Sequence, residues 1–87
     1  SAPKKEIFPL LQTIFKSLKP HGLFSLGLKL GAGEKRDKIG RQYSYFEEYE
    51  IRNILLKEEF RLISHQLGEA KGLDGESAKF IIILCHA

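Results

Sequence analysis

The sequence predicts a small α/β domain with the element order α-β-α-β-β and a three-stranded mixed sheet. Three observations lead to this prediction: two helical stripes of apolar residues, three apolar runs of strand length, and polar, glycine-bearing stretches between them. With 87 residues, of which 43% are hydrophobic, the chain has the size and composition of one globular domain. We therefore expect residues 1–87 to form a single domain.

The first predicted element is an amphipathic helix near the N-terminus. Apolar side chains recur there at helical spacing and form one stripe: Ile7, Leu10, Leu11, Ile14, Phe15 and Leu18. Pro9 removes an interior backbone hydrogen bond, so we expect the regular helix to start near Phe8 after a looser turn. The segment Lys19-Pro20-His21-Gly22 then ends the helix, because neither proline nor glycine favours its continuation.

A strand is expected over Leu23–Leu30, where nearly every residue is apolar or small. This pattern is typical of a strand that is covered on both faces. A polar loop follows over Gly31–Gln42, and it contains three glycines. Long ordered loops often carry function, so we regard this loop as a candidate site.

A second helix is expected to begin near Glu47 and Glu48, since acidic residues favour the first turn of a helix. Strands are then expected over Phe60–Leu67 and Ala78–Cys85, with a polar loop over Gly68–Ser77 between them. The last two strands have no helix between them and should run antiparallel. The first two strands are joined through a helix and should run parallel, which makes the predicted sheet mixed.

The net charge of +3 is concentrated in one short stretch. Residues 35–41 hold four basic side chains and one acidic one, so the remaining residues are balanced. One interpretation is that this basic loop meets phosphates while Tyr43, Tyr45 and Phe46 stack on bases. The alternative is a solvated loop whose aromatic residues pack into the core. A charge of +3 is small for a nucleic-acid-binding protein, so nucleic-acid binding is the less favoured interpretation.

Several classes of protein and site are disfavoured by the sequence. No apolar run is long enough to cross a membrane, and no signal-peptide pattern is present. The single Cys85 favours a reducing, cytoplasmic setting and should behave as a small buried hydrophobe with a raised pKa. The three histidines lack metal-ligand spacing, and no nucleophile lies beside a base. Gly31-Ala32-Gly33 begins a dinucleotide fingerprint, but Arg36 stands at its third glycine. We therefore predict no catalytic, cofactor-binding or metal-binding residue.

The order of the segments resembles the C-terminal half of a class I S-adenosylmethionine (SAM)-dependent methyltransferase. Leu18–Phe24 is similar to the family's "LKPGG" turn into its fifth strand, with His21 in place of a glycine. Leu28–Glu34 is similar to a strand end followed by a "GxGE" loop. Tyr43–Ile51 resembles the start of the next helix, and Leu55–Phe60 resembles its end, with Glu59 where glycine is typical.

This resemblance implies a partial Rossmann-like methyltransferase fold, in which the final strand lies between the other two. The family binds SAM through its N-terminal half, which this chain lacks. The full-length parent would therefore use SAM, whereas no cofactor is expected for this fragment alone, and whether the chain is an enzyme stays open. The resemblance also implies that the loop from Lys29 to Tyr45 lines the methyl-acceptor pocket. The candidate substrate-binding residues are Lys29, Arg36, Arg41 and Tyr43.

The resemblance further implies that the strand Leu23–Leu30 exposes the edge where the missing half would pair. That edge is long and apolar, with Lys29 as its only charge. We expect the chain to pair there, either with itself as a homodimer or with a separate N-terminal half, and we expect no membrane partner. Two other functions stay open: a free-standing dimerisation or interaction module, and a small nucleic-acid-binding domain.

Overall fold

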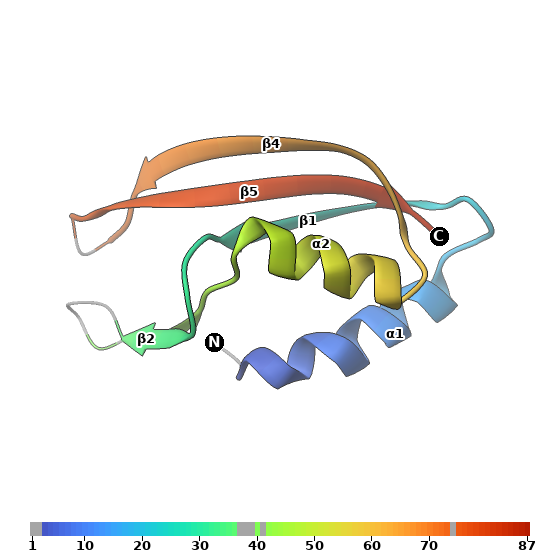
Figure 1. The fold of residues 1–87 in the computed structure, drawn as a ribbon, viewed down its shortest axis with the longest axis horizontal. Coiled ribbons are helices and arrows are strands. Elements are labelled where there is room, and N and C mark those ends of the chain that lie inside the picture. Colours follow the sequence, from blue (N-terminus) through green and yellow to red (C-terminus); the bar gives the residue numbers. More distant parts are fainter. Residues whose placement is uncertain (1–2, 37–39, 41, 74) are drawn as a thin grey trace.

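The computed structural model describes residues 3–36, 40, 42–73 and 75–87. Two helices lie on one face of a three-stranded sheet, and a short separate hairpin lies at one end (Figure 1). The elements in chain order are the 3-10 turn η1 (Lys4–Glu6), α1 (Ile7–Ser17), β1 (Leu23–Lys29), β2 (Glu34–Arg36), β3 (Gln42–Ser44), α2 (Glu48–Lys57), β4 (Arg61–Lys71) and β5 (Ser77–His86).

The five predicted elements occur in the predicted order, but two of the predicted loops contain strands. The loop Gly31–Gln42 holds β2 and the first residue of β3, which pair as an antiparallel hairpin. The loop Gly68–Ser77 was predicted too long, because β4 continues to Lys71. Polar residues remain in a strand there since each one pairs with β5, as Glu69 does with Lys79. Sequence polarity indicated exposure, and exposure does not exclude strand pairing.

The prediction of a mixed sheet is wrong. The strand order is β1-β5-β4, and both pairings are antiparallel. β1 and β4 run in the same direction, but β5 lies between them, so no parallel pair forms in this sheet. The reason is the short β4–β5 turn, which brings β5 back along β4 and into the position beside β1. The position of β5 between the other two strands is the arrangement that the family resemblance implied.

The core lies between the helices and one face of the sheet. Its buried side chains come from both helices, from the segments that flank α2, and from β5: Ile7, Leu11, Phe46, Ile51, Leu55, Phe60, Ile81, Ile83 and Cys85. The expectation that β1 is covered on both faces is wrong. Leu23, Ser25 and Gly27 are exposed, whereas the alternate residues Phe24 and Leu26 pack against the core. In this structure the helices cover only one face of the sheet.

The ends of both helices follow from local chemistry. η1 is the looser turn expected before the first helix, and α1 begins at Ile7. Pro9 therefore lies in the first helical turn, where backbone N–H groups have no partner within the helix. α2 begins after Glu47, whose side chain accepts a bond from the backbone of Glu50 while the Glu50 side chain bonds the Glu47 N–H. This capping box explains why the predicted start near Glu47 and Glu48 is confirmed.

Candidate functional site

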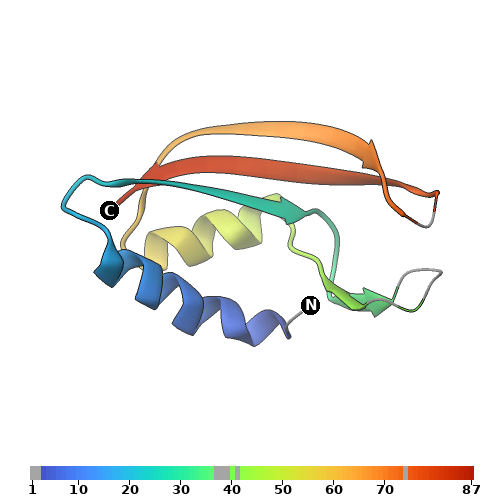
Figure 2. The ribbon, with the colours of Figure 1, turned by 180° about the vertical axis from the view of Figure 1, so that it is seen from behind.

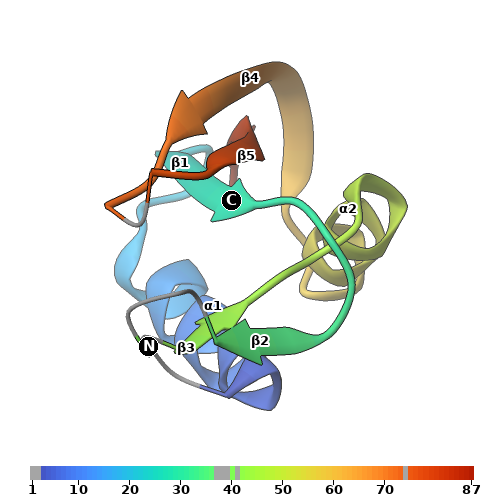
Figure 3. The same cartoon turned by 90° about the vertical axis from the view of Figure 1, so that its left-hand side faces the viewer.

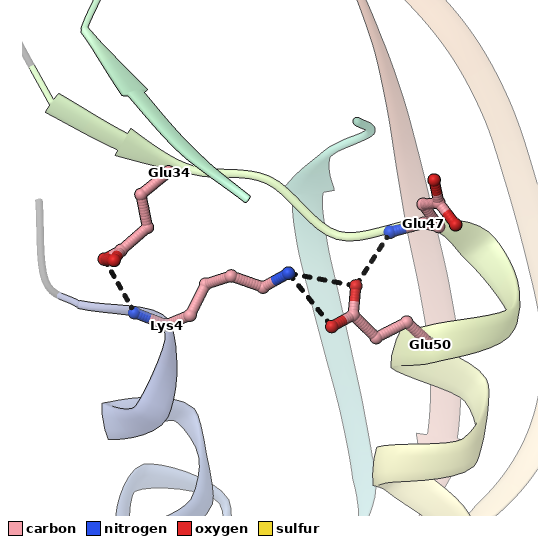
Figure 4. Close-up of polar contacts among 4 residues, drawn as sticks. All are labelled: Lys4, Glu34, Glu47 and Glu50. Atoms are coloured by element: carbon pink, nitrogen blue, oxygen red, sulfur yellow. Dashed lines mark hydrogen bonds and ion pairs between the residues drawn. The ribbon is translucent and has the colours of Figure 1, made fainter. Parts of the chain in front are cut away.

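A polar cluster joins the N-terminal ends of the two helices (Figure 4). The Lys4 ammonium lies 2.9 and 3.0 Å from the two carboxylate oxygens of Glu50. The Glu47 backbone N–H donates to Glu50 at 3.2 Å, and the Lys4 backbone N–H donates to Glu34 at 3.4 Å. The Lys4 ammonium also lies 4.7 Å from the centre of the Phe46 ring. These contacts connect η1, β2 and the start of α2.

An apolar groove lies next to this cluster, between α1 and β1. It has a volume of about 380 Å³ and is lined mainly by Ile7, Leu10, Leu26, Leu28 and Phe46. No residue of α2, β4 or β5 lines it, so it lies toward the outer side of β1. In the described part of the chain, no strand pairs with β1 on that side. The groove and the unpaired edge of β1 therefore form one surface.

The candidate substrate-binding residues begin where β1 ends. Lys29 is the last residue of β1, and its carbonyl accepts a hydrogen bond from the Phe46 N–H at 3.2 Å. Leu30 bridges to Phe46, and the Gly31 N–H donates to the Phe46 carbonyl at 2.9 Å. These bonds attach the base of the β2–β3 hairpin to the end of β1, and they therefore hold the loop beside Lys29.

The structure places the other three candidates on the hairpin itself. Arg36 ends β2, and its guanidinium donates to the Gly40 carbonyl at 2.8 Å, so it is engaged within its own hairpin. Tyr43 lies in β3, paired with Lys35. Arg41 lies outside the described residues. The four candidates therefore belong to one continuous segment of the chain, residues 29–43.

The Gly31-Ala32-Gly33 turn packs against Tyr45. Gly33 has φ of 69°, and its carbonyl accepts a bond from the Tyr45 N–H at 2.8 Å. Gly31 is needed where it stands, since a Cβ there would lie 3.1 Å from the Tyr45 ring. The turn leads into a β-strand, whereas a phosphate-binding turn leads into a helix N-terminus. The residues present here do not fit the phosphate-binding fingerprint.

Two aromatic residues after the loop, Tyr45 and Phe46, pack against other parts of the fold. Phe46 is only 3% exposed and belongs to the core. Tyr45 is half-buried, with the Lys35 ammonium 5.8 Å from its ring centre and Gly31 against its ring. The Phe46 ring is therefore inaccessible for stacking on bases, and the Tyr45 ring is partly covered. The interpretation that the loop aromatics pack into the fold is correct for Tyr45 and Phe46.

Two of the histidines are exposed, whereas the cysteine is buried. His21 lies in the turn before β1, while His65 lies on β4 with its Nδ1 2.8 Å from an Arg52 nitrogen. Cys85 is buried, burial raises the pKa of its thiol as predicted, and its Sγ donates to the Phe24 carbonyl at 3.4 Å. Within residues 3–36, 40, 42–73 and 75–87, no group of three potential ligands is arranged to hold a metal ion.

Sequence reasoning missed two lysines that share the end of β1 with Lys29. Lys71 was assigned to a loop, and Lys79 was passed over as part of the start of the last strand. The structure extends β4 and β5 past the end of β1, so both residues lie near Lys29 around one small hollow. The strand register places the side chains of Lys71 and Lys79 on one face of the sheet and that of Lys29 on the other.

Two non-glycine residues have a left-handed backbone, His21 with φ of 63° and Glu59 with φ of 71°. These are the two positions where the methyltransferase motifs typically have glycine. Glycine adopts positive φ without the steric penalty that other residues meet. Both positions therefore keep a backbone conformation that favours glycine, although neither residue is glycine.

No protein-family model and no curated protein sequence matches this chain. The solved structure of a SAM-dependent methyltransferase from Methanosarcina mazei matches its fold with a TM-score of 0.80 and 17% sequence identity. The match covers 94% of this chain and 51% of that one, so this chain spans about half the length of the methyltransferase. The similarity to a methyltransferase fold that the sequence motifs indicated is confirmed. In the described ranges, no helix has the length and hydropathy of a membrane span.

Proposed function

We propose that this chain forms the C-terminal half of a SAM-dependent methyltransferase. In this role it contributes the antiparallel edge of the sheet and part of the methyl-acceptor pocket, and it is inactive alone. The observation that supports the proposal most directly is the unpaired edge of β1 beside an apolar groove, in a fold that matches half of a methyltransferase structure. The edge is the place where the rest of such a sheet would continue.

The groove gives a physical reason for pairing at this edge. A strand added beside β1 would hydrogen-bond to its backbone and direct alternate side chains toward the helix layer. Leu26 and Leu28 point to that layer and line the groove together with Leu10, which is 53% exposed. Apolar side chains of the added strand would therefore bury these leucines, and a long apolar edge left open is prone to association.

Within this proposal, the segment that holds Lys29, Arg36, Arg41 and Tyr43 forms one wall of the acceptor pocket. Its basic residues would complement an anionic or polar methyl acceptor. Class I methyl transfer depends mainly on holding a nucleophile against the methyl group, so these residues would bind and orient the acceptor. The parent protein would bind SAM through its other half. A reducing, cytoplasmic setting belongs to the same proposal and is supported by the unpaired Cys85.

The proposal is tested by reading the coding sequence upstream of Ser1 and by measuring SAM binding. Translation of the sequence upstream of Ser1 should give an apolar strand followed by a glycine-rich turn. The longer chain should bind SAM in isothermal titration calorimetry, and the 87-residue chain should not. If the longer chain has the turn but binds no SAM, or if the upstream sequence encodes no such strand and turn, the proposal is wrong.

The edge of β1 also supports a second candidate, a homodimer that acts as an interaction module. The Leu30 N–H donates to Lys79 of β5. Backbone direction alternates along a strand, so the Ser25 and Gly27 N–H groups point to the outer edge. Two copies could pair these edges antiparallel about a twofold axis.

The variant Ser25→Pro tests pairing at this edge, because it removes an outward N–H while proline is tolerated on edge strands. Sedimentation equilibrium should show a dimer for the wild-type chain and for Ser25→Val, which keeps the N–H, and a monomer for Ser25→Pro. Leu26→Lys should also weaken association, since it places a charge in the groove. A wild-type chain that stays monomeric at high micromolar concentration would exclude the homodimer and leave the separate N-terminal half as the partner.

A further inference from the structure

The turn before β1 meets the end of β5 at the end of the sheet that lies away from the β2–β3 hairpin (Figures 1 and 2), whereas the hairpin end faces the viewer in Figure 3. Leu23, the first residue of β1, pairs with His86, the last residue of β5. The Ala87 N–H donates to the Gly22 carbonyl at 3.0 Å. The strand register therefore brings His21 next to His86, although the two residues are far apart in the sequence.

The imidazole rings of His21 and His86 lie close together. Their centroids are 5.7 Å apart, and the ring planes are tilted by 45°. His21 is exposed, and His86 is half-buried. Among the residues that the structure describes, no hydrogen bond or ion pair engages the His21 ring, so a nitrogen of this ring can bind a ligand.

A hydrogen bond fixes the tautomer of His86. Its Nδ1 lies 2.8 Å from the main-chain oxygen of Ala87. Because this oxygen can only accept, Nδ1 carries the proton, and Nε2 of the neutral ring holds a lone pair. Histidines that bind metal ions have this arrangement, in which one ring N–H donates to an oxygen and the other nitrogen binds the ion.

We propose that His21 and His86 form a two-histidine site for a divalent transition-metal ion such as Zn²⁺ or Ni²⁺. A Zn–N bond of about 2.0–2.1 Å, added to about 1.1 Å from ring nitrogen to ring centre, allows the centres of two rings on one ion to lie up to about 6.3 Å apart. The observed 5.7 Å lies within this limit. Neutral imidazole suits such ions, whereas Mg²⁺ and Ca²⁺ prefer oxygen ligands.

Two neighbours of His86 define what the site can hold. Cys85 is buried in the core, on the opposite face of the sheet, so its thiol is not a third ligand. Arg61 is exposed and stands opposite His86 in the strand register, so it lies on the same face as His86. Its charge opposes a bound cation, although water screens an exposed charge. An anion would instead depend on Arg61, because neutral imidazole rings carry no charge.

A metal ion held by both rings would link the turn before β1 to the end of β5. The two rings are close together only in the folded chain, so binding should stabilise the folded state. Water would complete the coordination of the ion, because no group of three potential ligands occurs in the described ranges. The site uses only residues of this chain and does not depend on the proposed function.

The experiment is isothermal titration calorimetry of the 87-residue chain at neutral pH with ZnCl₂ and NiCl₂, and with MgCl₂ as the control. Zn²⁺ and Ni²⁺ should each bind with one ion per chain, and Mg²⁺ should give no heat of binding. Urea denaturation with and without ZnCl₂ gives a second measurement. The midpoint should rise with Zn²⁺, since the ion binds the folded chain.

Histidine variants provide matched controls. His21→Asn and His86→Asn should each weaken binding about a hundredfold, because the remaining imidazole loses the second point of attachment. Asparagine adopts a left-handed backbone more readily than most residues, so His21→Asn should keep the turn. His65→Asn removes a histidine outside the pair and should bind as the wild type does. Circular dichroism of each variant checks the fold.

The variant Arg61→Gln distinguishes a cation from an anion at this site. It should tighten Zn²⁺ binding about twofold, as expected for the loss of one exposed repulsive charge. Four results would overturn the inference: no binding of Zn²⁺ or Ni²⁺, unchanged binding by the double variant His21→Asn/His86→Asn, an equal rise of the urea midpoint in that variant, or inorganic phosphate that binds the wild type in place of Zn²⁺ and is lost in Arg61→Gln. None of these results bears on SAM binding by the longer chain.

Discussion

At the scale of single residues, Glu59 and His21 each adopt the positive φ of a turn in which glycine is the usual residue. The Glu59 N–H bonds Leu56 and the Phe60 N–H bonds Leu55, each at 3.0 Å, which is the pattern of a Schellman helix end. At the other position, the Gly22 N–H donates to Lys19 at 2.8 Å across Pro20 and His21, as in a type II turn. Both motifs need positive φ, so both residues bear a steric cost.

Glu59→Gly should therefore stabilise the protein by about 0.5–1 kcal/mol. Relief of the left-handed conformation is worth about 1–2 kcal/mol, and the flexibility of glycine in the unfolded chain offsets part of it. Urea denaturation followed by circular dichroism measures the change. Lys57→Gly is the control, because it puts glycine in a helical position and should destabilise the protein by about 0.5–1 kcal/mol. Equal losses for both variants would show that the φ of Glu59 carries no cost.

Cys85 makes stability depend on pH in the alkaline range. Burial raises the pKa of its thiol above the ordinary value. Below about pH 8.5 the thiol is protonated in both states, but above this pH the unfolded chain loses the proton while the folded chain keeps it. The free energy of unfolding should therefore fall as pH rises toward the folded pKa. Urea melts at several pH values should show a steeper fall for the wild type than for Cys85→Ala, and parallel curves would contradict this assignment.

At the scale of elements, the Lys4–Glu50 pair connects segments that the sequence places far apart. Both side chains are half-buried, 22% and 33% exposed, so the charges are only partly screened by water. Glu50 also serves as the capping residue of α2, which joins the start of one helix to the start of the other. Because η1 lines the apolar groove, this pair also shapes the surface beside β1.

Glu50→Gln separates the two roles, because glutamine keeps the capping bond and loses the charge. The variant should lower the free energy of unfolding by about 0.5–1 kcal/mol at low salt, in the range of partly exposed ion pairs. The loss should shrink in high salt, and a cycle with Lys4→Gln should show coupling between the two positions. If the loss is independent of salt and uncoupled from Lys4, the ion pair contributes nothing.

At the scale of the whole molecule, the chain has one covered face and one uncovered face. The alternate residues of β5 on the uncovered face include Ile82, which is 40% exposed, with Phe80 and Leu84 on the same side. The sheets of doubly wound α/β folds carry helices on both faces. Under the proposed function, the uncovered face and the edge of β1 are the surfaces against which the other half would pack.

The whole chain should not bind SAM alone. The Gly31-Ala32-Gly33 turn after β1 leads into the β2–β3 hairpin, so it presents no helix N-terminus to a ligand. Isothermal titration calorimetry of the 87-residue chain with SAM should show no heat of binding. Tight binding would place the cofactor site within this chain and would contradict the proposed division between two halves.

The sequence by itself determined the local structure of this protein. The apolar stripe of α1, the acidic cap of α2 and the apolar run of β5 each depend on neighbours within a few residues. The first helix was expected to start near Phe8 and starts at Ile7, α2 begins at Glu48 as expected, and the last strand was expected over Ala78–Cys85 and spans Ser77–His86. The motifs with His21 and Glu59 also indicated the methyltransferase fold, because turn chemistry is local. The segment that holds the candidate site, residues 29–45, was named only through the resemblance to the methyltransferase family.

Only the tertiary structure decided which strands pair and what they bring together. Whether β1 and β4 pair depends on where β5 inserts, and this is a long-range choice that no local pattern contains. The same insertion leaves one edge of β1 unpaired and one face of the sheet uncovered, and it places Lys71 and Lys79 near Lys29. Contacts between distant segments depend on register and packing, so these features became visible only in the folded chain.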